Sequence, residues 1–140
     1  MEQDIPYEIQ WRTDFSALAN MARLGLKYTS RSDKREEAPE LLGKGMRLCT
    51  ILSKASEVGQ KEKIVSSEIP YHTISQVLID SGKNLDQVGT DSTRVLEILE
   101  SGRRGEKILE EDFDYANSFL VGVSEIYQKS AWRVLKSLTE

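Results

Sequence analysis

The C-terminal part of the chain carries a sustained helical pattern of apolar and polar positions. Spacings of three and four residues alternate along one row, as expected for a helix that lies against other helices. A second row, formed by Phe119 and Ile126, widens the apolar face beyond a narrow stripe. The pattern predicts one long helix over residues 108–138. The first row consists of Phe113, Ala116, Leu120, Val123, Tyr127, Ser130 and Val134.

Shorter stretches with helical periodicity precede this segment. They predict helices over residues 13–28, 39–58, 71–81 and 91–101. The fold class that follows is all-α: a single-domain bundle of about five helices over residues 1–140, with a long C-terminal helix. Residues 1–4 and 139–140 are expected to fray. In an antiparallel bundle with an odd number of helices, the first and last helices are expected to run in the same direction.

Local signals mark the expected helix ends. Thr13 and Asp14 are candidate N-caps because their side-chain oxygens accept from free backbone N–H groups. Pro39 suits a first helical turn, where its missing N–H has no consequence. A glycine follows three of the predicted helices as an expected left-handed stop. These glycines are Gly59, Gly82 and Gly102.

Two further signals concern the second and third predicted helices. Gly43 and Gly45 lie inside the second helix, where each costs about 1 kcal/mol relative to alanine. A close approach of another helix explains why both are tolerated. Pro70 biases the preceding residue away from helix, so the third helix is expected to begin after it. Thr73 and Gln76 have the spacing of a capping box at that point.

Charge and cysteine content narrow the classes of function. The formal net charge is −4, and the excess of acidic residues lies in the C-terminal half. No attraction of the whole surface to nucleic acid is therefore expected. The single cysteine, Cys49, excludes an internal disulfide and fits a reducing compartment. No apolar run approaches a membrane span, and no secretory signal is expected, so these features favour a cytoplasmic protein without a membrane partner.

Catalytic and metal-binding residues form no recognised pattern. His72 is the only histidine, which excludes a histidine-pair metal site within one chain, and a first-turn residue pointing to solvent is the simpler interpretation. Cys49 lies on the apolar stripe and is expected to be a small buried side chain. The helix dipole alone favours acidic residues in a first turn, here Glu110, Glu111, Asp112 and Asp114. We expect no enzyme, no cofactor and no metal.

Basic residues gather in the segments between predicted helices. One cluster contains Arg31, Lys34 and Arg35, and a second contains Arg103, Arg104 and Lys107. If the two loops fall at the same end of the bundle, they present a contact for phosphate, nucleic acid or an acidic partner surface. Each cluster also contains acidic residues, and ordinary solvated loop charge is the alternative interpretation.

The breadth of the C-terminal apolar face suggests a function. It offers more apolar surface than one neighbouring helix needs, and Trp132 lies beside it as a candidate anchor. The leading hypothesis is a non-enzymatic helical protein–protein interaction module, or a small subunit of a larger assembly, with a protein partner or a homodimer. Partner contacts are predicted at Trp132, Phe119, Ile126 and Tyr115. The alternative is a helical protein that associates with nucleic acid through its basic loops.

Overall fold

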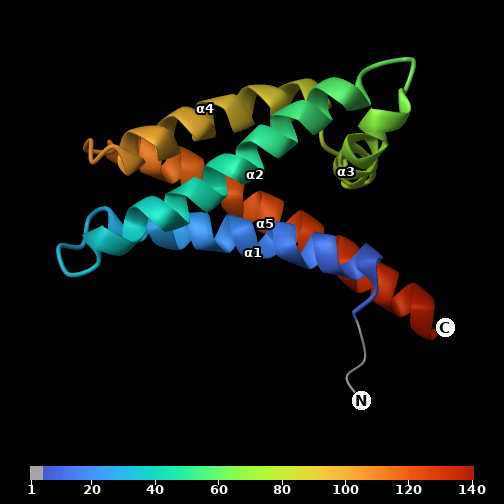
Figure 1. Ribbon diagram of the computed structural model, residues 1–140, viewed down its shortest axis with the longest axis horizontal. Coiled ribbons are helices and arrows are strands. Elements are labelled where there is room, and N and C mark those ends of the chain that lie inside the picture. Colours follow the sequence, from blue (N-terminus) through green and yellow to red (C-terminus); the bar gives the residue numbers. More distant parts are fainter. Residues whose placement is uncertain (1–4) are drawn as a thin grey trace.

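The computed structural model describes residues 5–140, and the fold is all-α as predicted (Figure 1). Two short 3-10 turns, η1 (Arg35–Glu37) and η2 (Ser66–Glu68), lead into the second and third helices. The expected long C-terminal helix is confirmed as α5, which continues unbroken to Thr139. The expected fraying of residues 1–4 lies outside the described residues. The helices are α1 (Tyr7–Tyr28), α2 (Ala38–Gly59), α3 (Ile69–Asp80), α4 (Leu85–Arg103) and α5 (Glu110–Thr139).

The four long helices form two antiparallel pairs, α1 with α5 and α2 with α4, whereas α3 crosses at one end of the molecule (Figure 1). Polar contacts fix the direction of the first pair. Ser16 and Ser124 share a hydrogen bond of 2.9 Å between their hydroxyl oxygens. Arg23 Nε donates to Asn117 Oδ1 at 3.1 Å, seven residues later in α1 and seven residues earlier in α5. The expectation that the first and last helices run in the same direction is wrong. Because α3 turns across the bundle, only α1, α2, α4 and α5 alternate in direction, and with four such helices the first and last are antiparallel.

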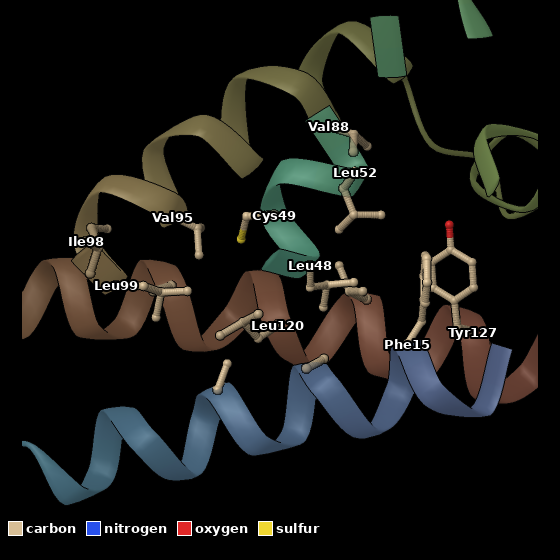
Figure 2. Close-up of a cluster of buried hydrophobic side chains, with 14 of the residues drawn as sticks. Phe15, Leu48, Cys49, Leu52, Val88, Val95, Ile98, Leu99, Leu120 and Tyr127 are labelled. Carbon is tan, nitrogen blue, oxygen red and sulfur yellow. The ribbon is translucent and has the colours of Figure 1, made fainter. Parts of the chain in front are cut away.

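Buried side chains from all five helices form one hydrophobic cluster. Figure 2 shows part of it, with labelled residues from α1, α2, α4 and α5. At its α3 end, the rings of Phe15 and Tyr127 meet edge to face with centroids 5.0 Å apart. Trp11 packs edge to face against both rings. The fully buried Tyr127 satisfies its hydroxyl by donating to the Ile74 carbonyl oxygen at 2.8 Å. This bond ties α3 to α5, and burial raises the pKa of the phenol well above its ordinary value.

Two helices, α1 and α4, begin six residues earlier than the sequence predicts. α1 starts after Pro6, so Thr13 lies inside the helix and donates to the Ile9 carbonyl oxygen at 3.0 Å. The predicted caps at Thr13 and Asp14 are therefore wrong. α4 begins with Asn84 as its N-cap, whose side chain accepts from Gln87 N at 3.0 Å. Gly89, in the first turns of α4, interrupts the apolar periodicity, which hid this start.

The start of α3 also differs from the prediction. The 3-10 turn η2 leads directly into the helix, and Ile69 has helical dihedral angles of φ −53° and ψ −45°. Pro70 occupies the first turn, where no N–H is needed, so its bias on Ile69 is overridden. Thr73 Oγ1 donates to the Ile69 carbonyl oxygen at 3.2 Å. Gln76 Nε2 donates to Asp80. The predicted capping box is wrong, because both of its members lie within the helix.

Of the three predicted glycine stops, only Gly82 has the left-handed conformation, with φ +79°. α4 ends at Arg103, and the left-handed glycine that follows it is Gly105, with φ +83°. The Glu106 N–H closes this turn by donating to the Ser101 carbonyl oxygen at 3.0 Å. Gly59 and Gly102 are helical, and the predictions for them are wrong. Both lie at close contacts: a Cβ on Gly59 would lie 2.6 Å from Leu85 Cδ1. At these two positions glycine is needed because neighbouring side chains pack closely against the helix, and not because the helix ends in a left-handed turn.

The two internal glycines of α2 have different roles. A Cβ on Gly45 would lie 2.4 Å from Ala22 Cβ of α1 and 2.8 Å from Leu99 Cδ1 of α4. The predicted close approach of helices is therefore confirmed at Gly45. At Gly43 it is wrong, because a Cβ there would make only an ordinary contact with the Arg103 guanidinium, at 3.8 Å.

The contrast between these glycines gives a prediction for stability. Gly45→Ala is expected to destabilise the protein by about 1–3 kcal/mol, because the added methyl group overpacks the contact among three helices. Gly43→Ala is the matched control and is expected to be neutral or to stabilise by up to about 1 kcal/mol through helix propensity. Urea unfolding followed by circular dichroism measures both, and equal effects at the two positions would contradict this account of α2.

Candidate functional site

A groove of about 620 Å³ opens between α4 and α5. The two helices lie close together where α4 ends and separate toward α3, and the turn between α3 and α4 closes the far end (Figure 1). We call this the α4–α5 groove. Its walls are Leu78, Gly82, Lys83, Asn84, Gln87, Val88, Asp91, Glu111, Asp114, Tyr115, Ser118, Phe119, Gly122, Val123 and Ile126.

Three of the four residues predicted to bind a partner line this groove. Tyr115, Phe119 and Ile126 are half-buried, pack against the edge of the core and keep part of each side chain on the groove wall. They occupy one side of α5, beside the row that enters the core at Leu120 and Val123. The second apolar row of α5 is therefore only partly covered by the other helices.

Gly122 lies on the groove wall between the levels of Phe119 and Ile126. A Cβ at this position would meet nothing within 4 Å, so no neighbouring element requires a glycine here. A glycine inside a helix nevertheless costs about 1 kcal/mol relative to alanine. Its effect is to leave the middle of the groove open. Sequence reasoning missed this residue because the helical pattern was read from apolar side chains, and a glycine has none.

A polar network holds Tyr115 at the rim of the groove. Its hydroxyl donates to Asp91 Oδ1, which also accepts from Gln87 Nε2 at 2.9 Å. The Arg94 guanidinium lies over the phenol ring, 4.4 Å from its centroid, and pairs with Asp112 at 3.3 Å. Burial, then the hydrogen bond to Asp91 and the charge of that carboxylate, raises the pKa of Tyr115 to about 12. Tyr115 is therefore a neutral, fixed side chain at physiological pH.

The rim of the groove is predominantly acidic. Asp91, Glu111 and Asp114 line it, with Lys83 as the one cation among the lining residues. Glu111 and Asp114 are exposed and make no ion pair within residues 5–140. The acidic cluster at the start of α5 is thus divided, because Asp112 turns to Arg94 instead. Over the part of the chain that the structure describes, no group of three or more potential metal ligands is found.

Trp132, the fourth predicted partner residue, lies outside the groove. Its side chain is 67% exposed, near the C-terminal end of α5. Leu135 and Leu138, exposed to 39% and 59%, continue this end of the helix. Three of the predicted partner residues therefore line the groove, and the fourth is an exposed tryptophan beyond its end on the same helix.

The two basic loops meet at the same end of the bundle (Figure 1). They share a cavity of about 490 Å³, which we call the basic pocket because Arg35, Arg103 and Lys107 line it. The other three predicted cations form ion pairs within the loops and the end of α4. Arg31 pairs with Asp33 at 2.9 Å, Lys34 with Glu37 at 3.3 Å, and Arg104 with Glu100 at 3.1 Å.

The lone cysteine and histidine lie away from both cavities. Cys49 is fully buried in the core, and burial raises the pKa of its thiol to about 12, so the prediction of a small buried side chain is confirmed (Figure 2). His72 differs from the prediction of a solvent-facing residue. It is half-buried, and its Nδ1 atom is buried without a hydrogen-bond partner within residues 5–140.

Comparison of the chain with protein-family models, curated proteins and solved structures finds no match. Among the described residues, no helix has an apolar stretch long enough to cross a membrane.

The network around Tyr115 predicts a change in its titration. Asp91→Asn removes the negative charge that opposes phenolate formation, so the pKa of Tyr115 is expected to fall from about 12 while staying above the ordinary 10.0, because burial is the largest cause. Ultraviolet absorption of the phenolate measures it, and the difference from a Tyr115→Phe variant isolates this residue from the other tyrosines. An unchanged titration would contradict the Asp91 contact.

Proposed function

We propose that this protein is a non-enzymatic interaction module whose α4–α5 groove receives an amphipathic helical segment of a protein partner. The observation that carries the proposal is the half-covered row on α5, where Phe119 and Ile126 flank the open position of Gly122. An apolar row left half-covered beside a groove is the arrangement in which a partner helix contributes the missing side chains.

The dimensions of the groove suit a helix of a few turns. The row from Tyr115 to Ile126 spans about 17 Å at the helical rise of 1.5 Å per residue. A partner helix presents anchors at spacings of three and four residues over the same distance. A large apolar anchor opposite Gly122 fills the space that this residue leaves open. The held ring of Tyr115 contributes apolar area at little entropic cost.

The acidic residues at the rim of the groove favour a partner segment with basic side chains. Because Asp91, Glu111 and Asp114 surround the apolar row and only Lys83 opposes them, the complementary segment carries lysine or arginine beside its apolar anchors. Rim charges of this kind chiefly accelerate association, and salt screens their effect. A second copy of this chain is the alternative occupant of the groove, and its binding would make the protein a dimer.

Filling the groove tests the proposal. Gly122→Trp is expected to weaken partner binding by tenfold or more, since the ring occupies the space of the partner's anchor. Gly122→Ala is the matched control: it is expected to keep binding and to stabilise α5 by up to about 1 kcal/mol. Partners are identified by affinity capture with both variants, and the affinity of the identified segment is then measured by isothermal titration calorimetry.

The results distinguish a partner helix from a second copy of this chain. A partner that is lost with Gly122→Trp and kept with Gly122→Ala supports the proposal, and equal binding by the two variants overturns it. Sedimentation of the purified protein gives the second test. If the protein is a dimer that Gly122→Trp converts to a monomer, the occupant of the groove is a second copy of this chain and not a partner helix.

Charge reversal at the rim gives an independent prediction. Glu111→Lys combined with Asp114→Lys is expected to reduce the association rate for the basic segment at least tenfold at low salt, with a smaller effect at high salt. Glu125→Lys, an exposed residue of α5 that does not line the groove, is the control. Stopped-flow fluorescence at two salt concentrations measures the rates, and an equal effect of the control variant would contradict a directed electrostatic role.

A further inference from the structure

The basic pocket brings together cations from segments far apart in the sequence. Arg35 comes from the turn before α2, whereas Arg103 and Lys107 come from the end of α4 and the loop that follows it. The Arg103 guanidinium carbon lies 3.8 Å from the position that a Cβ on Gly43 would take, so the group lies against the first turns of α2. The fold, and not local sequence, creates this concentration of positive charge.

The three cations of the basic pocket are left without counter-charges. Arg35, Arg103 and Lys107 make no ion pair within residues 5–140, in contrast to Arg31, Lys34 and Arg104 on the same loops. The one carboxylate on the pocket wall, Glu106, is held by Arg104 at 3.2 Å. The hydrogen bond from Arg104, and then one from Ser101, lowers the pKa of Glu106. The donors free to face a ligand are therefore two guanidinium groups and one ammonium group.

Apart from Glu106, no residue that lines the pocket carries a carboxylate. α2 begins there at Ala38, directly after the 3-10 turn η1, and the Ala38 N–H donates to the Arg35 carbonyl oxygen. The hydroxyls of Thr29 and Ser30 already donate to carbonyl oxygens of α1, at 2.6 and 2.9 Å. Arginine pairs with phosphoryl and carboxylate oxygens alike in bidentate geometry, and a phosphate dianion matches three cations more closely than a single carboxylate does.

Size and charge distribution favour a small ligand over a nucleic-acid surface. A cavity of about 490 Å³ falls in the range that encloses small organic molecules and exceeds the need of a bare phosphate ion. Pro39 and Ile108 add apolar wall for the organic part. The other three cations of the same two loops are ion-paired, so the unpaired positive charge of these loops is concentrated in the pocket and does not form the extended track that a polynucleotide requires.

We propose that the basic pocket binds a small phosphate monoester, with Arg35, Arg103 and Lys107 contacting its phosphoryl oxygens. The ring or chain that carries the phosphate lies against Pro39 and Ile108. This site is separate from the α4–α5 groove, and neither shares a lining residue with the other.

The test is a nuclear magnetic resonance titration of the whole protein with ribose 5-phosphate, inorganic phosphate and ribose. Ribose 5-phosphate is expected to shift the amide signals of residues 35–40 and 102–108 in a saturable way, and ribose is expected to shift none. Lowering the pH below about 6 is expected to weaken binding, because the monoester loses its second charge there. Comparable binding of inorganic phosphate at the same signals supports the phosphoryl site and identifies the free anion as a ligand.

Variants keep the proposal falsifiable. Arg35→Gln combined with Arg103→Gln is expected to weaken binding at least tenfold, whereas Arg47→Gln, an exposed and unpaired arginine outside the pocket, is expected to leave it unchanged. Both arginines of the pocket are exposed, so the variants retain the fold, which circular dichroism verifies.

Three results would overturn the proposal. These are equal binding of ribose and ribose 5-phosphate, no saturable shift with any phosphate, or equal loss of binding with Arg47→Gln. Tighter binding of a single-stranded oligonucleotide, with equal sensitivity to Arg31→Gln and Arg104→Gln, would replace the pocket with a nucleic-acid surface. Gly122→Trp is expected to leave phosphate binding unchanged, so this proposal and the proposed groove function fail independently.

Discussion

The close packing of α2 against its neighbours is the constraint on which the rest of the structure depends. At Gly45, α1 and α4 approach α2 so closely that a methyl group would collide with Ala22. Further along, Ser56 donates a hydrogen bond to the Leu85 carbonyl oxygen, and a Cβ on Gly89 would lie 2.8 Å from Ser56 Oγ. Together these contacts hold α4 on α2 over much of its length. α4 therefore meets α5 mainly at its C-terminal end, and the groove opens where the two helices separate.

The same arrangement produces the second cavity. Because the four long helices alternate in direction and α3 turns across, the α1–α2 and α4–α5 loops lie at one end and α3 lies at the other (Figure 1). Arg35 and Arg103 meet at the loop end, whereas the groove extends toward α3. The same packing of helices thus produces an acidic, partly apolar groove and a basic pocket. The groove suits a basic, amphipathic segment, and the pocket suits an anion.

Helical periodicity made part of the candidate site predictable. Phe119 and Ile126 fall beside the core row because 3.6 residues complete a turn, and the structure places both on the groove wall. Gly122 was missed because periodicity follows apolar side chains and a glycine contributes none. The first turns of α4 were missed for a related reason, because Gly89 interrupts the apolar row there and Asn84, a residue type that commonly caps helices, was not recognised as the N-cap.

The sequence by itself determined the helical class, the long C-terminal helix and the side of that helix that carries Phe119 and Ile126, because these follow from local spacing. Only the tertiary structure decided that α1 and α5 are antiparallel, that α3 crosses the bundle and that Arg35 joins Arg103 at one cavity. Those outcomes depend on which helices approach most closely, and that choice is made by contacts such as Gly45 with Ala22, between residues distant along the chain.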